Sequence, residues 1–283
     1  MGNMNFSVLM SVYIKEKPEF LKESLDSVFN QTLLPTEVIL IEDGPLTNEL
    51  YNTIKDFSNK HKELKIIPLE KNYGLGHALN IGLKHCKYNL VARMDSDDIC
   101  KPNRFEKEIK FMYNNNDIDI CSSWIDEFEN DKNNVVSQRR IPETHEEIIK
   151  YAKLRCPVNH PTVVYKRDKV IELGGYKDFP EDYYLWIKMI MNGCKFYNLQ
   201  ESLLYFRFTS DLYKRRGGWK YAKDDLRAQK KFYSVGFLTK REFLFNVIVR
   251  STIRLIPVEL RSFIYKYILR KRILLRKSFG ATK

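Results

Sequence analysis

The stretch Tyr88-Asn-Leu-Val-Ala-Arg-Met-Asp-Ser-Asp-Asp98 is the part of the chain that decides the fold. Its first half is an apolar run typical of a buried strand. Three carboxylates then follow within four residues, where the strand is expected to leave its sheet. Because side chains alternate along an extended chain, Asp95 and Asp97 point to one side and Asp98 to the other.

Two carboxylates held this close repel each other unless a cation lies between them. Mg²⁺ and Mn²⁺ prefer oxygen ligands, and ligands of open α/β sheets bind at the carboxyl ends of the strands. We therefore predict a divalent metal site formed by Asp95 and Asp97. The alternative is a solvated acidic turn in which Asp98 caps the helix that begins near Lys101-Pro-Asn-Arg104.

Strand and helix patterns alternate on both sides of this stretch. Apolar strands are predicted near residues 5–11, 35–43, 64–68, 117–122 and 159–166, and helices near 18–30, 49–61, 78–85, 103–114 and 182–192. This order predicts βαβ units and a largely parallel sheet. Residues 126–140 are rich in Asn and Asp, which favours a loop. Strand signals end near residue 210, so we predict an α/β domain over 1–210 and a helical, basic extension over 211–283.

Composition places the chain among folded globular proteins. Of its 283 residues 43% are hydrophobic, and five are cysteines, an odd number without any C-x-x-C spacing. Reduced thiols in a cytoplasmic protein are the expected state. The N-terminus lacks the pattern of a signal peptide, and no apolar run reaches the roughly 18 residues of a spanning helix.

The net charge of +12 is concentrated at the C-terminus. Residues 240–283 hold 12 Lys and Arg against two acidic residues, which leaves the rest of the chain nearly neutral. From Leu260 onward apolar residues recur at helical spacing among these cations. This pattern is typical of an amphipathic helix on an anionic membrane surface, and we expect that partner rather than nucleic acid. The alternative is a helix that packs on the preceding domain with a hydrated basic face.

Four segments in one order resemble a known family. They are Ser7-Val-Leu-Met-Ser-Val-Tyr13, Glu42-Asp-Gly44, Asp95-Ser-Asp-Asp98 and Pro180-Glu-Asp-Tyr-Tyr-Leu-Trp186. Together they resemble the family 2 glycosyltransferases with a GT-A fold, especially bacterial enzymes of capsule, exopolysaccharide and O-antigen assembly. The resemblance covers about residues 4–210. In the extension, Arg215-Arg-Gly-Gly-Trp219 is similar to amylovoran-type exopolysaccharide transferases.

The resemblance implies a binding site for a nucleotide-diphosphate sugar, with a UDP-sugar as the expected donor. Asp43 is expected to hydrogen-bond the base, although Asp-Gly is also an ordinary turn. The residues that the resemblance places around the donor are Ser11, Tyr13, Asp43, Asn72, Gly74, Asn80, Asp95, Arg215 and Arg216. For the two arginines an ordinary basic surface stretch is the alternative.

The resemblance also implies roles for the acidic residues. Asp97 is expected to hold Mn²⁺ or Mg²⁺ on the diphosphate, with Asp95 contacting the ribose or a metal-bound water. Asp182 is expected to be the general base that deprotonates the acceptor hydroxyl, although Glu-Asp after a proline also suits the first turn of a helix. Residues expected on the acceptor side are His160, Glu181 and Trp186.

The predicted activity is thus an inverting, metal-dependent transfer of one sugar to a lipid-linked saccharide, at the cytoplasmic face of a bacterial plasma membrane. Two other classes were weighed. A sugar-phosphate nucleotidyltransferase normally carries a glycine-rich phosphate loop after its first strand, and this chain has no glycine there. A non-catalytic basic module that binds membrane or nucleic acid leaves the acidic strand ends unexplained.

Overall fold

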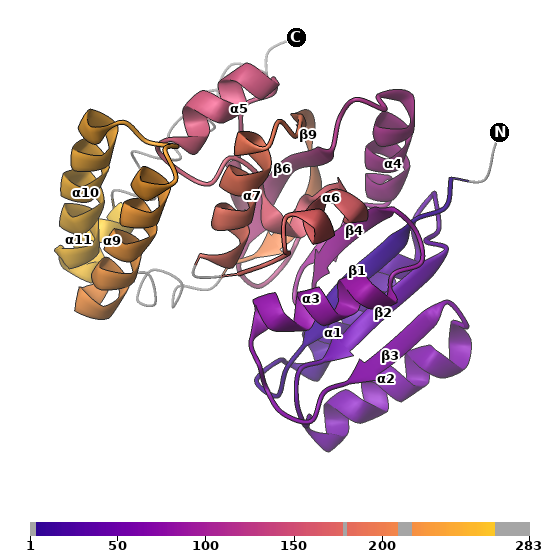
Figure 1. Ribbon diagram of the computed structural model, residues 1–283. Coiled ribbons are helices and arrows are strands. Elements are labelled where there is room, and N and C mark those ends of the chain that lie inside the picture. Colours follow the sequence, from indigo (N-terminus) through magenta and orange to yellow (C-terminus); the bar gives the residue numbers. More distant parts are fainter. Residues whose placement is uncertain (1–3, 178–179, 209–216, 264–283) are drawn as a thin grey trace, which may run out of the picture. The chain divides into compact units, whose positions relative to one another are not determined.

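The structure is a computed structural model that describes residues 4–177, 180–208 and 217–263 (Figure 1). Its N-terminal half alternates strands and helices, as predicted. These elements are β1 (Ser7–Val12), α1 (Pro18–Phe29), β2 (Glu37–Glu42), α2 (Asn48–Lys60), β3 (Leu64–Pro68), α3 (Leu75–His85) and β4 (Leu90–Asp95).

The remaining elements are less regular in order. They are β5 (Ile99–Cys100), α4 (Arg104–Asn114), β6 (Ile120–Phe128), β7 (Val135–Arg139), α5 (His145–Ala152), the 3₁₀ turn η1 (His160–Thr162), β8 (Val164–Lys166), α6 (Arg167–Glu172), α7 (Glu181–Met191), β9 (Phe196–Arg207), α9 (Gly218–Ser234), α10 (Lys240–Leu255) and α11 (Val258–Phe263).

The described strands form a mixed sheet in the order β3-β2-β1-β4-β8-β6-β9-β5, with β7 paired to β6. The first four strands are parallel, and β8 runs antiparallel to β4. The chain steps outward from β1 to β2 and β3, and then returns to the opposite side of β1 as β4. The carboxyl ends of β1 and β4 therefore flank a topological switch point, the position where open α/β sheets bind ligands.

Alternating side chains of the central strands build one core on each face of the sheet. Val8, Met10 and Leu40 face the core that α1, α2 and α4 cover. Leu9 and Ile39 face the core that α3, α6 and α7 cover. Burial on both faces explains why these strands are almost continuously apolar.

The chain divides into two compact units, residues 1–125 with 141–206, and residues 126–140 with 207–283. The segment 126–140 thus groups with the C-terminal residues, whereas the predicted boundary near 210 left it in the first domain. This segment is also not the loop that its composition favoured. It completes β6 and forms β7, and the side chains of Ser137 and Gln138 donate hydrogen bonds to Glu127 and Asp126.

Two further features differ from the sequence analysis, one in an alternative that it left open and one in a strand that it did not predict. Asp98 does not cap the helix after the acidic stretch, because α4 begins at Arg104 with Asn103 in the cap position. The long strand β9 was not predicted. Its sequence, Phe196-Tyr-Asn-Leu-Gln-Glu-Ser-Leu-Leu-Tyr-Phe-Arg207, mixes polar and apolar residues without a sustained period of two.

Candidate active site

Three carboxylates meet where β4 leaves the sheet. Asp95 is the last residue of β4, and in the pairing with β1 it lies beside Ser11. One carboxylate oxygen each from Asp95, Asp97 and Asp98 lies within 4.8 Å of the others. The Ser24 hydroxyl of α1 donates a 2.8 Å hydrogen bond to the Asp95 carbonyl, which fixes the end of the strand.

This acidic cluster carries more negative charge than its surroundings balance. Burial, together with the nearby charges of Asp95 and Glu16, raises the pKa of Asp97 to about 7. A bound cation removes this conflict, since it replaces the proton and neutralises the neighbouring carboxylates. The donor set, all carboxylate oxygen, suits Mg²⁺ or Mn²⁺. The residues present therefore fit the predicted metal.

Arg93 is a functional candidate that sequence reasoning missed. Its guanidinium is almost completely buried and pairs with the Asp95 carboxylate. It also lies close enough to Asp98 and Tyr176 for their charges to affect it. The available signal was an arginine two residues before Asp95, inside an otherwise apolar strand.

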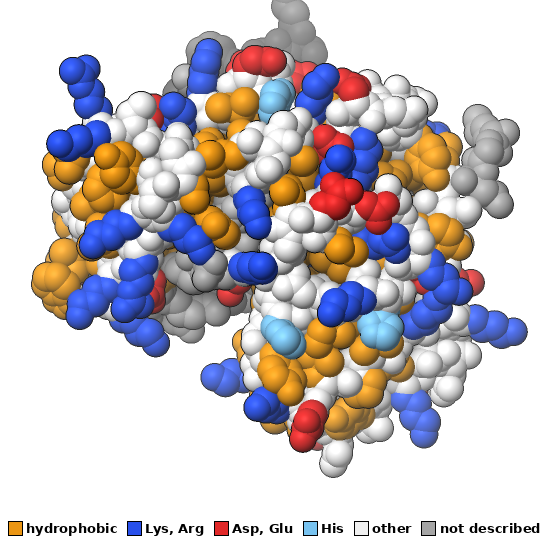
Figure 2. All heavy atoms as spheres, in the orientation of Figure 1, with side chains coloured by type: hydrophobic (Ala, Val, Ile, Leu, Met, Phe, Trp, Pro, Cys, Tyr) orange, Lys and Arg blue, Asp and Glu red, His pale blue; other side chains and the backbone are white. Residues whose placement is uncertain are grey.

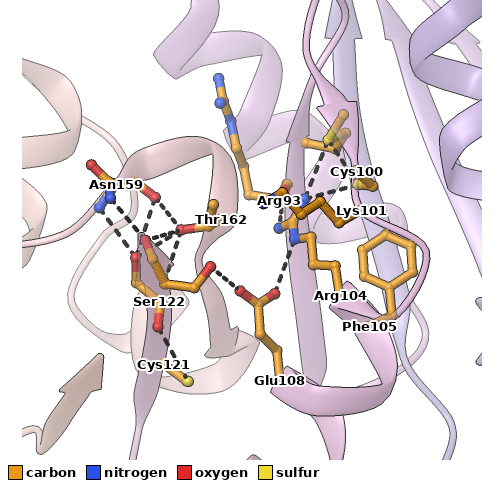
Figure 3. A network of polar contacts seen from close by, with 12 residues as sticks. Arg93, Cys100, Lys101, Arg104, Phe105, Glu108, Cys121, Ser122, Asn159 and Thr162 are labelled. Atoms are coloured by element: carbon orange, nitrogen blue, oxygen red, sulfur yellow. Dashed lines mark hydrogen bonds and ion pairs between the residues drawn. The ribbon is translucent and has the colours of Figure 1, made fainter. Parts of the chain in front are cut away.

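A second buried ion pair supports β4 from the other side (Figure 3). Arg104 and Glu108 are fully buried and lie 3.0 Å apart, and Arg104 donates a 2.7 Å hydrogen bond to the Arg93 carbonyl. Glu108 accepts from the Ser123 hydroxyl at 2.8 Å. The pair therefore ties α4 to β4 and β6, while the Arg93 side chain points away from the pair.

The predicted base-binding residue, Asp43, is buried and already has partners. Its two oxygens accept hydrogen bonds from the backbone N–H groups of Tyr73 and Gly74, at 2.8 and 3.1 Å. Next to it Gly44 has φ +90°, and a Cβ there would lie 2.5 Å from the Asn72 nitrogen. The end of β2 thus holds the loop before α3. Ser11 is half-buried, whereas Tyr13 and Asn72 are exposed at the same ends of the strands.

Asn80 connects α3 to the segment before α7. Its Nδ2 donates to the Tyr176 carbonyl at 2.6 Å, and its Oδ1 accepts from the Tyr176 N–H at 2.8 Å. Gly175 has φ +68°, and a Cβ there would lie 2.1 Å from Asn80 Oδ1. In this structure the Asn80 carboxamide therefore positions Tyr176, a residue that sequence reasoning did not single out.

Tyr176 lies among the predicted acceptor-side residues. Its hydroxyl is 3.1 Å from His160 Nε2, and its ring packs edge-on against Trp186. Burial and the nearby Arg93 charge lower the pKa of His160 well below its usual value, so the imidazole is neutral at pH 7. Trp186, which was predicted on the acceptor side, is fully buried, and its ring packs edge-on against those of His160 and Tyr176, so a place on that side stays a prediction.

The predicted base, Asp182, lies in the first turn of α7 and is half-buried. Its Oδ1 accepts from the Tyr183 N–H at 2.7 Å, and the Cys156 thiol lies 3.9 Å from its Oδ2. The preceding Glu181 lies against Gly76 of α3, and burial raises the pKa of the Glu181 carboxyl. Burial, together with the nearby charges of Asp182 and Asp95, raises the pKa of the Tyr176 hydroxyl, so both carboxylates lie near it.

Most of the predicted site residues thus lie at one edge of the sheet, at the ends of β1, β2 and β4 and the starts of α3 and α7. Arg215 and Arg216 lie outside the described residues.

An open α/β sheet with a carboxylate cluster at its switch point marks a ligand-binding site, and comparison with known proteins identifies the family. Residues 7–174 match the family described as "Glycosyl transferase family 2", and the chain belongs to it. It is a glycosyltransferase, as predicted.

The chain is similar along almost its whole length to characterised relatives. It is 44% identical over 268 residues to the UDP-Gal:alpha-D-GlcNAc-diphosphoundecaprenol beta-1,3-galactosyltransferase of Escherichia coli, covering 94% of this chain and 97% of the relative. It is 38% identical to the amylovoran biosynthesis glycosyltransferase AmsE of Erwinia amylovora, covering 92% and 98%. The predicted resemblance to this group is confirmed.

Solved structures confirm the predicted GT-A fold. A mannosyltransferase of Pyrobaculum calidifontis in complex with GDP-Man and Mn²⁺ superimposes with a TM-score of 0.64 at 17% identity, covering 99% of this chain and 76% of the other. Staphylococcus aureus TarS in complex with UDP-GlcNAc also gives 0.64, at 16% identity, covering 96% and 77%. At these identities the likeness establishes the fold alone.

Proposed function

We propose that this glycosyltransferase moves one sugar from a UDP-sugar to a lipid-linked saccharide, with inversion at the anomeric carbon. The observation that carries the proposal is the carboxylate cluster of Asp95, Asp97 and Asp98 at the switch point of the sheet. The E. coli relative, at 44% identity, is named for transfer from UDP-Gal to a diphosphoundecaprenol-linked GlcNAc. A UDP-sugar and a polyprenyl-diphosphate saccharide are therefore the substrates that we propose first.

The donor would lie along the carboxyl ends of β1, β2 and β4. In the proposed arrangement Asp95 and Asp97 hold Mn²⁺ or Mg²⁺, which neutralises negative charge on the departing diphosphate when bound. The P. calidifontis mannosyltransferase, which shares the fold, was solved with Mn²⁺ and GDP-Man. Arg93 holds the Asp95 carboxylate in position through the ion pair between them.

Asp182 is the proposed general base. It stands at the start of α7, and Tyr176 lies near both Asp182 and Asp95. Asp182 takes the proton of an acceptor hydroxyl as that oxygen forms its bond to the anomeric carbon and the bond to the diphosphate breaks. A single displacement of this kind inverts the configuration. Burial raises the pKa of the neighbouring Glu181, which would make its carboxylate a stronger base, so a Glu181 variant is the comparison that tests the assignment to Asp182.

The proposed site of action is the cytoplasmic face of the plasma membrane, where a lipid-linked acceptor is held. Within the described part of the chain, no helix combines the length and apolarity needed to cross a bilayer. Contact with the membrane would then be peripheral. The basic segment that we predicted for this role, from Leu260 to the C-terminus, lies almost entirely outside the described residues.

A release assay tests the proposed function. Purified protein is incubated with Mn²⁺, one UDP-sugar at a time and a GlcNAc-diphosphate linked to a short lipid, and both UDP and the extended glycolipid are measured. The expected result is acceptor-dependent UDP release with at least one donor, which EDTA abolishes. Turnover with GDP-sugars alone would overturn the UDP assignment, and turnover in EDTA would overturn the metal.

A further inference from the structure

Helix α10 departs from the usual arrangement of polar and apolar residues in a surface helix. In a water-soluble domain a surface helix turns its apolar stripe inward and its polar side chains outward. Here Asn246 and Arg254 are buried, whereas Phe245 and Ile248 are 57% and 67% exposed. Exposed apolar side chains continue along the same side of the helix and form what we name the α10 apolar face: Leu244, Phe245, Ile248, Val249 and Leu255.

The buried polar side is a specific interface with α9. Asp225 of α9 accepts hydrogen bonds from Arg250 and Arg254 of α10, with ion-pair distances of 2.6 and 3.2 Å. One turn further on, Asn246 donates to Gln229 at 3.0 Å. These contacts orient α10, and a capping box between Thr239 and Glu242 starts the helix. The exposure of the apolar face therefore follows from a defined packing, not from a loosely attached helix.

Folding in water alone does not account for this arrangement. Burying charged and amide groups costs desolvation, whereas apolar side chains left in water contribute no hydrophobic stabilisation. An exposed contiguous apolar surface of this kind marks contact with another apolar phase. We therefore expect another apolar surface to cover the α10 apolar face.

The charges around this face indicate which partner it takes. Residues 217–260 carry nine Lys and Arg against four Asp and Glu, and Asp225 is buried. Exposed cations on the two helices include Lys220, Lys223, Arg227, Lys230, Lys240 and Arg241. Figure 2 shows basic and hydrophobic side chains intermixed over α9 and α10. Two copies of such a surface would bring like charges together, whereas anionic lipid headgroups would pair with them.

We propose that the α10 apolar face is a membrane-docking surface that inserts into the headgroup region of an anionic bilayer. The proposal deepens the proposed function and rests on it in one respect, because a lipid-linked acceptor lies in such a bilayer. Aliphatic and aromatic side chains ringed by Lys and Arg suit a helix that lies in the plane of the interface. Trp219 is 73% exposed and lies at the N-terminal end of α9, where Arg254 packs over Tyr221. An exposed indole at this position suits the membrane–water interface.

Vesicle flotation of the full chain tests the proposal. The vesicles contain either phosphatidylcholine alone or equal parts of phosphatidylcholine and phosphatidylglycerol. The variant is Phe245→Ser with Ile248→Ser, and the matched control is Leu34→Ser with Leu154→Ser, two exposed apolar residues of the other unit. We expect wild type and control to float with the anionic vesicles, and the α10 variant to lose at least about tenfold in partition coefficient.

Three results would overturn the proposal. They are equal flotation of the α10 variant and the control, equal flotation on both lipid mixtures, and a wild-type dimer in sedimentation that the α10 variant dissociates. Because both side chains face solvent, the variant should unfold at the wild-type temperature. If it does not, Leu244→Ser repeats the test. UDP release with a short-lipid acceptor is measured in parallel for the wild type and the α10 variant. A failure of the proposed function then shows as absent UDP release, and a failure of docking shows as unchanged flotation.

Discussion

Asp97 is the residue where the electrostatic conflict of the site is greatest. It is largely buried, it faces two other carboxylates of the acidic cluster, and its pKa rises to about 7. Arg93 forms its ion pair with Asp95, and its charge offsets the rise in the pKa of Asp97 only in part. Binding of a divalent cation at Asp97 is therefore more favourable than binding at an isolated, solvated aspartate, because it relieves the repulsion among the carboxylates.

Asp97→Asn should weaken donor binding in the presence of Mn²⁺ by roughly 100-fold or more, because even indirect partners of a metal are worth about 10–100-fold in its affinity. Isothermal titration with UDP, with and without Mn²⁺, measures this. The matched control is Asp56→Asn, on the exposed side of α2. Unchanged, Mn²⁺-dependent binding to the Asp97 variant would exclude the residue as a ligand.

Asp182→Asn should lower kcat by roughly 10²–10⁴ while UDP affinity stays near that of the wild type, because a general base acts only in the chemical step. The matched comparison is Glu181→Gln, one residue away in the same helical turn. If the Glu181 variant loses more turnover than the Asp182 variant, the base has been assigned to the wrong carboxylate.

His160 should make the protein sensitive to mild acid. Its pKa is lowered in the folded state, so below about pH 6.5 the unfolded chain binds a proton that the folded chain does not. Stability is therefore full above that pH and falls as the pH falls. Urea unfolding at about pH 8 and about pH 5.5 should show a smaller loss for His160→Gln than for wild type. An exposed histidine substituted in the same way, His85→Gln, should leave the loss unchanged.

At the scale of elements, local periodicity predicted the parallel strands and their helices because burial on both faces leaves a clear apolar signal in residues such as Val38–Ile41. The end of β4 and the start of α7 were placed correctly for the same reason. Strand β9 is held by pairings with β5 and β6 that a local pattern does not record, and β7 lies within a segment whose polar composition favours a loop. Arg93, Tyr176 and the pairing of Asn80 with Tyr176 are likewise properties of the assembled fold.

The buried pair of Arg104 and Glu108 gives a test at this scale. Glu108→Leu should destabilise the protein by about 3–5 kcal/mol, because it leaves the Arg104 charge buried without its carboxylate. Arg104→Met combined with Glu108→Leu should recover most of that loss, since neither charge then has to be buried. Urea unfolding measures both. A double variant as unstable as the single one would show that the pair's hydrogen bonds to β4 and β6 matter more than its charges.

At the scale of the whole molecule, the cysteines report on the integrity of the fold. All five are free, and four are buried, whereas Cys156 beside Asp182 is half-buried. Burial, with the nearby Glu37 charge, raises the pKa of Cys86 to about 12, and burial also raises the pKa values of Cys100, Cys121 and Cys194. A thiolate is the reactive species, so these four thiols are inert while the protein is folded.

A thiol reagent such as DTNB should therefore label Cys156 quickly in the native protein and the other four only as the chain unfolds. A Cys156→Ser variant should lose the fast phase and keep the slow one. Stability should be the same with and without reductant, since no disulfide is present. Rapid labelling of two or more thiols in that variant would contradict the burial described here.

The pairing of Asn80 with Tyr176 has a consequence for engineering. It joins α3 to the segment that leads into α7. Gly76 of α3 and Glu181 of α7 lie against each other at the same junction. The two halves of the site are therefore not separate modules. A graft of the 72–80 segment from a relative, made to change the donor sugar, would also displace the segment that leads into α7. Residues 174–176 would have to be transplanted with it.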